Sequence, residues 1–476
     1  MANFRDLDQL ILERISKANM PGVSLAAIRD NEVIYKRGYG LRDLEKGLPA
    51  TPATLYGIGS VTKSFTCLAL MQLQERGLLS VDDKVIEHLE FSIKPFGEDV
   101  KVRHLMSHTS GIPALAYAEA VIRKSTGASS RGLSMGSIED MLTFMEGAAD
   151  WAHAKPGERW FYLNEGYILL GAIIERVSGL SYQEYVRKYI LEPLGLERSF
   201  FNRESFEEDS EAAVPYAIDQ EGNRRPGEYL FGVISSDGGL ISSVEDLSRY
   251  VGMFLGGGKV DGAQIISEEA LQEMMAPRVA TPPLQAQELI DGGAGYRVDL
   301  SRTEPARHYG YGLGMQGDFF GETVISHGGS VGIATAYMAF IPQRGVGIAL
   351  LSNGAGYPLG YFAEYGLALL LGEDPEALSF RKAETALEAL EGTYETFKGT
   401  MQATLRRQGD FLVFEAKDKL SNWRATLIPE LLGSDAAQFF RLEGGFKIPV
   451  EFVISGDDVE FLFERYKFRK IGALAG

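Results

Sequence analysis

The stretch from Tyr56 to Gly77 constrains this chain more than any other, because it joins a glycine-rich turn to a long apolar pattern. Gly57 and Gly59 precede Ser60, and Lys63 follows three positions later. Apolar residues then recur with helical spacing until a glycine, a residue type that commonly ends helices. The pattern predicts a helix that begins beside Ser60.

Ser60 and Lys63 would lie on one face of that helix, since residues three apart are neighbours there. Unpaired amides at a helix start also stabilise negative charge. A serine hydroxyl becomes a nucleophile when a base removes its proton, and a desolvated lysine amine is such a base. The spacing recurs at Ser379 and Lys382, but without the glycine turn or the apolar helix. Context therefore distinguishes the first pair.

The composition excludes several classes of protein. A net charge of −18 opposes binding to nucleic acid through a basic surface. The single cysteine, Cys67, cannot form an internal disulfide and is expected in the core. The first residues do not resemble a secretory signal, and no stretch approaches the ~18 apolar residues of a membrane span. We therefore expect a cytoplasmic protein with no nucleic-acid or membrane partner.

Strand-like runs lie at both ends of the first 372 residues. Residues 23–28 and 33–39 read as a hairpin, and residues 335–340 and 346–351 as two further strands. Helical patterns lie between them, including one at about residues 165–177 and one at 102–112. This order predicts one sheet built from both ends of the domain, with a helical block inserted.

The composition changes after Gly372. Residues 373–387 are charged and rich in alanine and glutamate, as expected of a linker or linking helix. Short strand-like runs follow to the end of the chain. We therefore predict a domain at 1–372, a linker at 373–387 and a small all-β barrel or sandwich at 388–476.

Two further motifs carry polar groups. Tyr162 and Asn164 precede an apolar helix, where a loop can aim a phenol and an amide at one point. A core tyrosine with a helix-capping asparagine is the structural alternative. His327, Gly328, Gly329 and Ser330 follow a β-rich run, and such glycines let a substrate lie along a strand. A glycine-rich turn with an incidental surface histidine is the alternative there.

In this order, the motifs resemble those of the penicillin-recognising serine hydrolases, which include class C β-lactamases, DD-peptidases, family VIII esterases and D-aminopeptidases. The resemblance covers about residues 8–370. It implies an α/β (α+β) β-lactamase/DD-peptidase-like domain with an antiparallel sheet and an inserted helical block. The C-terminal part is similar to the lipocalin-like barrel of D-aminopeptidase relatives and of archaeal self-compartmentalising serine peptidases. That similarity implies a homo-oligomer.

The resemblance also assigns roles. It implies Ser60 as nucleophile, Lys63 as general base and Tyr162 as a proton relay. His327 joins these catalytic residues, and the substrate-binding residues are Asn164, Gly328, Gly329 and Ser330. The oxyanion hole would consist of the backbone amides of Ser60 and Ser330. The sequence contains no metal-ligand spacing and no phosphate-binding loop, so no metal or cofactor is expected.

The third motif departs from the family pattern of lysine and threonine. A histidine is only partly charged near neutral pH, and Gly328 has no hydroxyl. This argues against β-lactamase and carboxypeptidase activity. The resemblance then implies acyl-enzyme formation on peptides or small amides, with a preference for D-amino acids among the options. A carboxylesterase is the alternative, followed by a catalytically silent binding or scaffold protein.

Overall fold

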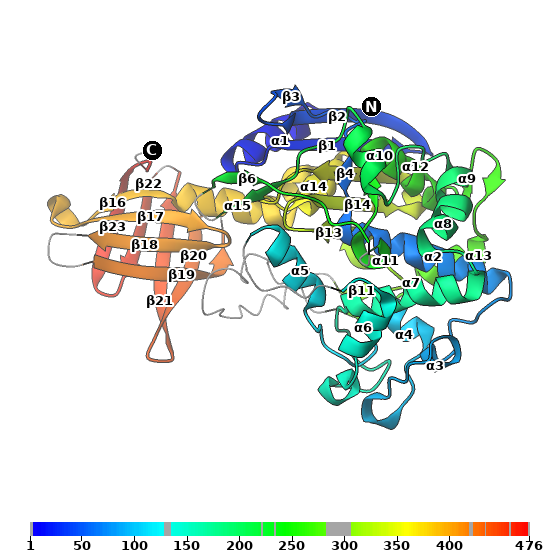
Figure 1. Cartoon of the computed structure of the whole chain (residues 1–476). Coiled ribbons are helices and arrows are strands. Elements are labelled where there is room, and N and C mark those ends of the chain that lie inside the picture. The colour runs from blue at the N-terminus through cyan, green and yellow to red at the C-terminus, as the bar shows by residue number, and fades with distance from the viewer. Residues whose placement is uncertain are drawn as a thin grey trace. The chain divides into compact units, whose positions relative to one another are not determined.

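The computed structural model describes residues 3–127, 135–219, 222–232, 235–281, 306–417, 422–433, 435–456 and 458–474. These residues form two compact units that divide between Glu373 and Asp374 (Figure 1). The first unit combines helices with an antiparallel sheet, and the second is a closed antiparallel barrel. The predicted fold class is therefore confirmed.

Within the described residues, nine strands form the sheet of the first unit. Strands from its two ends are neighbours, since Val23 pairs with Ser352. This confirms the expected sheet. In spatial order the strands are β10 (Val279–Ala280), β11 (Arg307–Tyr309), β12 (Gly314–Phe319), β13 (Glu322–Ser330), β14 (Thr335–Ile341), β15 (Val346–Ser352), β1 (Gly22–Arg29), β2 (Glu32–Asp43) and β3 (Leu48–Pro49).

Helices cover both faces of this sheet. On β15, a side chain at Gly347 would meet Val251 of α12 (Val244–Leu255), whereas the next residue, Ile348, lies against Gly366 of α14 (Leu359–Leu371). Successive residues of a strand point to opposite faces, so the two helices lie on opposite sides. All seven residues of β15 are accordingly buried.

The helical block follows β4 (Tyr56–Gly57) along the chain. It packs on the face of the sheet that α12 covers, where Phe65 of α2 stacks on Tyr250 of α12. Its main helices are α2 (Thr62–Glu75), α4 (Val102–Met106), α5 (Tyr117–Ser125), α6 (Ile138–Phe144), α7 (Asn164–Ser178), α8 (Tyr182–Val186), α10 (Arg203–Glu208) and α11 (Ser235–Gly238). Other elements of the unit include α1 (Arg5–Lys17), α3 (Val85–His88), α9 (Glu192–Leu194), α13 (Glu268–Met274), β5 (Tyr216–Ile218), β6 (Arg224–Pro226), β7 (Ile241–Ser242), β8 (Lys259–Val260) and β9 (Ala263–Gln264).

One predicted helix is much shorter than the sequence pattern indicated. The stretch expected as a helix over 102–112 is helical only to Met106. The Ser107 hydroxyl donates to the carbonyl of Arg103, and His108 adopts a left-handed backbone with φ of 57°. Side-chain bonding to the preceding turn and a left-handed residue both end a helix.

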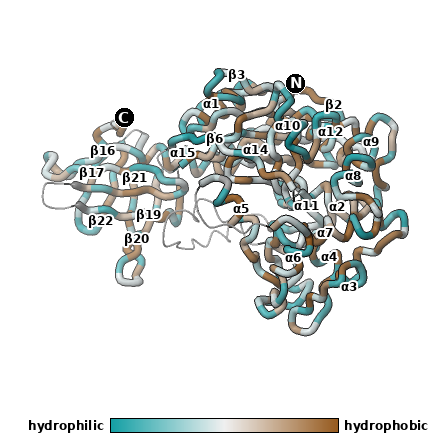
Figure 2. The backbone as a smooth tube through the Cα atoms, viewed as in Figure 1, coloured by the Kyte–Doolittle hydropathy of each residue, from teal (hydrophilic) through white to brown (hydrophobic). Residues whose placement is uncertain are grey.

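The second unit is a closed barrel filled by its own side chains. Phe414, Phe461 and Phe468 are buried in its core and pack ring against ring. Buried and more exposed residues alternate along Asp458–Phe463, and Figure 2 shows apolar (brown) and polar (teal) segments on the barrel strands. The strands are β16 (Gly392–Glu395), β17 (Gln402–Gln408), β18 (Phe411–Lys417), β19 (Asn422–Leu432), β20 (Ala436–Glu443), β21 (Phe446–Ser455), β22 (Asp458–Phe463) and β23 (Tyr466–Gly472).

The helix α15 (Ser379–Leu390) lies in the stretch expected as a linker. Leu387 and Leu390 on this helix belong to the core of the barrel. Ser379 and Lys382, which repeat the spacing of the first motif, are both exposed on it. Exposed side chains lack the desolvation that activates a lysine base. The environment of this pair therefore differs from that of Ser60 and Lys63.

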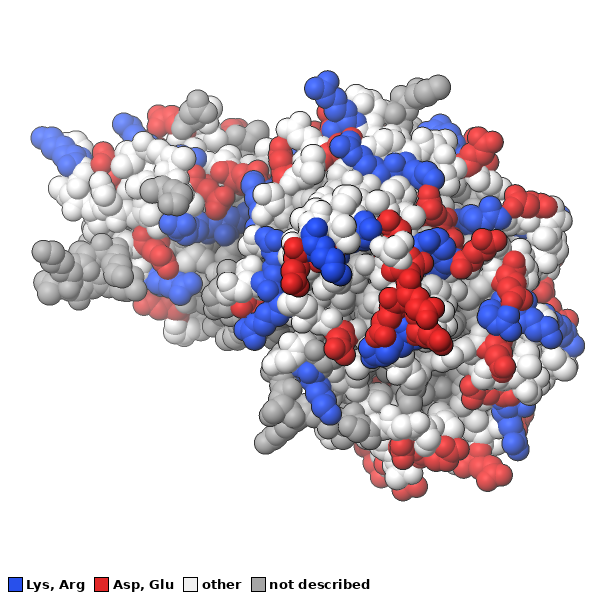
Figure 3. All heavy atoms as spheres, turned by 45° about the horizontal axis from the view of Figure 1, so that its top comes forward, with Lys and Arg blue, Asp and Glu red and all other residues white. Residues whose placement is uncertain are grey.

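The surface carries charges of both signs. Figure 3 shows acidic and basic side chains interspersed over the face turned to the viewer. Such mixing gives no extended basic surface on that face. Within the described ranges, every helix is too short or too polar to cross a membrane.

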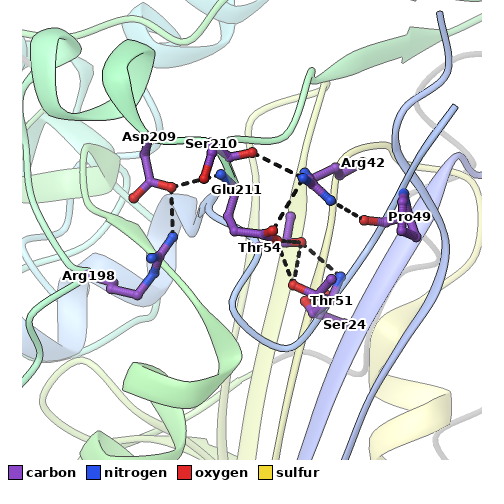
Figure 4. A network of polar contacts seen from close by, with 9 residues as sticks. All are labelled: Ser24, Arg42, Pro49, Thr51, Thr54, Arg198, Asp209, Ser210 and Glu211. Carbon is purple, nitrogen blue, oxygen red and sulfur yellow. Dashed lines mark hydrogen bonds and ion pairs between the residues drawn. The ribbon is translucent and has the colours of Figure 1, made fainter. Parts of the chain in front are cut away.

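A buried polar network fixes the segment that leads into Ser60. Arg42 on β2 forms an ion pair with Glu211 at 3.2 Å and donates to the carbonyl of Pro49 at 2.5 Å (Figure 4). The Glu211 carboxylate also accepts hydrogen bonds from the hydroxyls of Thr51 and Thr54. These contacts join the sheet to the loop that precedes β4, and β4 leads directly to the nucleophile turn.

We expect Glu211→Gln to lower the free energy of unfolding by about 2–4 kcal/mol, because Arg42 would be left buried without its charged partner. Urea denaturation followed by tryptophan fluorescence measures this change. The matched control is Glu207→Gln, since Glu207 forms an exposed ion pair with Arg203. Exposed pairs contribute under about 1 kcal/mol. Equal losses in both variants would contradict a structural role for the network.

Candidate active site

Ser60 and Lys63 lie together at the start of α2. Ser60 belongs to a short 3₁₀ turn, Gly59–Val61, which runs directly into the helix. The Lys63 ammonium nitrogen donates to the Ser60 hydroxyl at 3.0 Å. Ser60 is partly exposed, whereas Lys63 is fully buried. A substrate can therefore reach the hydroxyl while the amine stays out of water.

The Lys63 amine is surrounded by groups that hold its position. It donates to the backbone carbonyl of Asp237 at 2.6 Å. It also lies 5.0 Å from the ring centre of Tyr162 and 5.4 Å from that of Tyr167. Aromatic faces attract cations, so both rings help to hold the amine in place. Tyr162, the tyrosine of the second motif, therefore lies beside Lys63, the candidate base.

The turn before Ser60 packs closely against the third motif on β13. A side chain at Gly329 would lie 2.2 Å from the carbonyl oxygen of Ile58 and 3.0 Å from the amide nitrogen of Ser60, so only glycine fits there. A side chain at Gly59 would in turn lie 3.2 Å from the amide nitrogen of Ser330. The two amides expected to form the oxyanion hole therefore lie on adjoining segments, beside the nucleophile.

His108 positions the segment that carries Tyr162. Its backbone carbonyl accepts from the amide of Phe161 at 2.8 Å, and its Nδ1 accepts from the amide of Leu163 at 3.0 Å. Its ring lies 4.1 Å from that of Tyr162, centre to centre. Burial, together with the charge of Lys63, lowers the pKa of His108 well below its usual range. His108 is therefore a neutral acceptor that supports Tyr162.

The structure changes the interpretation of His327. The sequence predicts a partly charged histidine, but burial and the nearby Lys63 lower the pKa of His327 to about 3. Its Nδ1 lies 2.7 Å from the carbonyl of Gly328 and its Nε2 lies 2.8 Å from the hydroxyl of Tyr309. A neutral ring that donates from Nδ1 and accepts at Nε2 satisfies both contacts. His327 therefore brings no positive charge to the site at neutral pH.

Asn164 lies at the first position of α7 and its amide donates to Glu119 of α5 at 3.5 Å. The adjacent Glu165 is buried and accepts from the backbone amide of Tyr117 at 2.9 Å. Both residues thus connect α7 to α5. Asn164 follows the motif tyrosine Tyr162 by two residues, and its side-chain amide bonds to the carboxylate of Glu119.

The sequence pattern does not mark Asp237 as a candidate site residue. It is 4% exposed, and its Oδ1 has no hydrogen-bond partner in the described part of the chain. Burial raises the pKa of Asp237 to about 7, although the charge of Lys63 acts in the opposite direction. The only local signal was an aspartate before two glycines, which is typical of any turn. Only the fold brings this carboxyl beside the lysine.

Within the described residues, no three histidine, cysteine or carboxylate side chains gather as metal ligands. The polar groups at the site include a hydroxyl, an amine, phenols, neutral imidazoles, the carboxyl of Asp237 and backbone amides. Such a set is suited to acyl transfer, in which a carbonyl oxygen develops negative charge.

Comparison with known proteins agrees with this geometry. The family model described as Beta-lactamase matches residues 7–372. The chain belongs to the beta-lactamase family. A second model, described as Pab87 octamerisation domain, matches residues 375–469. The resemblance to the penicillin-recognising superfamily is therefore confirmed.

Relatives of this family member span bacteria and archaea. The solved structure of the octameric penicillin-binding protein homologue from Pyrococcus abyssi is 41% identical, with a TM-score of 0.89 over 98% of this chain and 99% of that one. Protein flp of Staphylococcus aureus (strain MW2) is 26% identical over 73% of this chain, and the match covers 63% of the length of flp. Penicillin-binding protein 4* of Bacillus subtilis (strain 168) is 28% identical over 51% of this chain and 54% of its own length.

Proposed function

We propose that this family member is a serine hydrolase that forms an acyl-enzyme on Ser60 and acts on peptides or small amides. The contact of 3.0 Å between the Ser60 hydroxyl and the buried Lys63 amine carries the proposal. It pairs an accessible nucleophile with a base shielded from water. Membership of the beta-lactamase family supports the same chemistry.

The reaction begins when Lys63, in its unprotonated form, accepts the proton of the Ser60 hydroxyl. The Ser60 oxygen then bonds to the substrate carbonyl carbon, and the backbone amides of Ser60 and Ser330 stabilise the oxyanion. Tyr162 passes the proton to the leaving nitrogen as the amide bond breaks. Water, deprotonated by the same groups, finally attacks the acyl-enzyme, releases the acid and restores the Ser60 hydroxyl.

Two observations favour amide substrates whose carboxylate is not the main anchor. The neutral His327 offers no cation to hold a substrate carboxylate. The relative from Bacillus subtilis is described as a penicillin-binding protein and the structure from Pyrococcus abyssi as that of a penicillin-binding protein homologue, and penicillin is itself an amide. The resemblance to D-aminopeptidases makes peptides with D-amino acids the first substrates to examine.

The test is the intact mass of the protein after treatment with a fluorophosphonate probe, followed by peptide mapping. We expect one adduct on Ser60 in the wild type and none in Ser60→Ala. Ser379→Ala is the matched control, because Ser379 shares the spacing to a lysine but is exposed on α15, and it should label as the wild type does. Labelling that persists in folded Ser60→Ala would refute the proposed nucleophile.

A carboxylesterase is the alternative within the same chemistry, since an ester needs less assistance to its leaving group than an amide does. Relative values of kcat/KM on p-nitrophenyl esters and on L- and D-aminoacyl amides distinguish the two. Turnover of esters with none of amides would favour the esterase. A folded wild type that takes up no probe and cleaves neither class would favour a silent binding or scaffold protein.

We also propose that residues 388–476 mediate assembly of a homo-oligomer. The match to an octamerisation domain and the octameric homologue support this. The outer face of the barrel carries apolar side chains that are exposed in the single chain, including Val453 at 57% and Leu462 at 47%. These two lie on the neighbouring strands β21 and β22, in diagonal register. Exposed apolar clusters commonly mark association surfaces.

We expect the double variant Val453→Glu/Leu462→Glu to lower the molar mass measured by light scattering, because burying two carboxylates at an apolar interface is unfavourable. The wild type should have a mass several times that of one chain. Leu12→Glu on α1, which is 47% exposed in the first unit, is the control and should leave the mass unchanged. A wild type with the mass of one chain would refute the oligomer.

A further inference from the structure

Tyr309 on β11 joins the third motif to the rest of the candidate active site. Its hydroxyl lies 2.8 Å from Nε2 of His327, and the residue is buried. Its ring lies 5.1 Å from that of His108, centre to centre, and 6.3 Å from that of Trp160. His108 and Trp160 both pack on Tyr162. Tyr309 therefore contacts His327 directly and is linked to Tyr162 through two other rings.

The segment after Tyr309 is fixed against α2, the helix that carries Lys63. The amide of Gly312 donates to the carbonyl of Met106 at 3.2 Å. A side chain at Gly312 would lie 2.8 Å from the Lys63 carbonyl oxygen and 3.0 Å from Cys67 Sγ, and the backbone φ there is 67°. Only glycine allows so close an approach in a left-handed conformation. The position of Tyr309 is thus tied to the turn of α2 that holds Lys63.

Both ring nitrogens of His327 are engaged by the protein. Nδ1 lies 2.7 Å from the carbonyl of Gly328, the next residue, and Nε2 faces the Tyr309 hydroxyl. Because the ring is uncharged, Nδ1–H donates to Gly328 and Nε2 accepts from Tyr309. The bond at one ring nitrogen sets which nitrogen carries the proton, so the Tyr309 hydroxyl fixes this arrangement. His327 therefore acts on the backbone of its own strand.

That part of the strand needs a constraint because its residues are small. Gly328, Gly329 and Ser330 end β13, and the pairing of β13 with β12 ends at Ser326, beyond which β13 pairs with β14. Glycines adopt more backbone conformations than other residues. Gly329 packs against the Ser60 amide, and Ser330 supplies the second amide expected in the oxyanion hole. Rotation of the peptide between the two glycines would therefore displace an oxyanion-hole amide.

We propose that Tyr309 is a positioning residue for the reaction. Its hydroxyl holds His327, which orients the peptide after Gly328 and so places the Ser330 amide that stabilises the oxyanion. The proposal rests on the serine-hydrolase function proposed above and deepens it, since it assigns His327 to the geometry of β13 rather than to contact with the substrate. A displacement of about 1 Å at such a group costs up to about 10²-fold in rate.

The test is a double-mutant cycle on kcat that uses Tyr309→Phe, His327→Leu and the two combined, with His327→Ala should the leucine variant fold poorly. Rates are expressed per Ser60 that reacts with the fluorophosphonate probe, so that misfolded molecules do not count. We expect Tyr309→Phe to lower kcat by about tenfold and to leave KM within about twofold of wild type, because the oxyanion exists only beyond the ground state. Adding Tyr309→Phe to the His327 variant should change kcat by less than about twofold, since Tyr309 acts through His327.

Tyr337→Phe is the matched control. The Tyr337 hydroxyl also donates to β13, at 3.2 Å from the hydroxyl of Ser326, and its removal should leave kcat at the wild-type value. A Tyr309→Phe variant with wild-type kcat would overturn the positioning role alone, as would losses that multiply in the double variant or an equal loss in Tyr337→Phe. A folded wild type whose Ser60 reacts with no probe and that cleaves no substrate would overturn the proposed hydrolase, and this inference with it.

Discussion

Replacing Lys63 by methionine is expected to lower kcat by about 10³-fold or more, with a much smaller change in KM. The amine bonds to the Ser60 hydroxyl at 3.0 Å, and its removal takes away the base that activates the nucleophile. General-base catalysis contributes roughly 10²–10⁴-fold, and residues that act as a unit lose more than one isolated contribution. Methionine has nearly the same length and apolar character as the lysine stem. The packing of α2 should therefore survive.

Steady-state kinetics on the best substrate found in the screen measure this effect, with circular dichroism as the check on folding. The matched control is Lys382→Met, because Lys382 follows Ser379 with the same spacing but is exposed on α15. This control should keep wild-type kcat. If folded Lys63→Met retained more than a tenth of kcat, another group would have to be the base.

The second large effect concerns the buried carboxyl of Asp237. We expect Asp237→Asn to gain stability relative to the wild type as the pH rises from 4 to 8, by about 4 kcal/mol. The pKa of Asp237 is raised from 3.8 to about 7 in the folded state. Below pH 3.8 the group is protonated in both states and imposes no cost. Between these values the unfolded state ionises first, so the wild type loses stability until about pH 7.

Urea unfolding of both proteins at pH 4 and pH 8 provides the measurement. Comparing the two pH values cancels any constant cost of placing an amide beside Lys63. Asp261→Asn is the control, since the Asp261 side chain is 77% exposed, and its difference from the wild type should change little with pH. A difference between Asp237→Asn and wild type that is the same at both pH values would contradict the buried, high-pKa carboxyl.

Activity should report the same titration. The carbonyl of Asp237 accepts from the Lys63 amine at 2.6 Å, so ionisation of the side chain changes the charge close to the candidate base. We expect an inflection near pH 7 in the wild-type profile of kcat/KM, and its loss in Asp237→Asn. Buried ionisable groups with shifted pKa values are common at catalytic sites, where they lower the stability of the folded protein.

Several features could be predicted from the sequence because they depend on local spacing. Ser60 and Lys63 lie within one turn of each other, so helical periodicity alone brings them together. The cap of α12 is equally local, since the hydroxyl of Ser243 accepts from the amide of Asp246 at 3.2 Å. The strands at both ends of the first unit follow from short β-rich apolar runs.

Other features could not be predicted, because they depend on contacts distant in the chain. The neutral state of His327 arises from burial against Tyr309 and proximity to Lys63. His108 adopts a left-handed conformation just after α4 ends, and its ring packs on Tyr162 from a segment distant in the chain. Asp237 comes from a segment more than 170 residues beyond Lys63.

The sequence by itself determined the local elements, the spacing of the serine and the lysine, and the resemblance to the family, since each of these depends on residues that are close together in the chain. Tertiary structure alone decided the electrostatics of the site. Burial lowers the pKa of His327 and raises the pKa of Asp237. It therefore keeps the imidazole uncharged and holds the carboxyl protonated up to about pH 7. Desolvation depends on everything that packs around a group, and no local pattern contains that information.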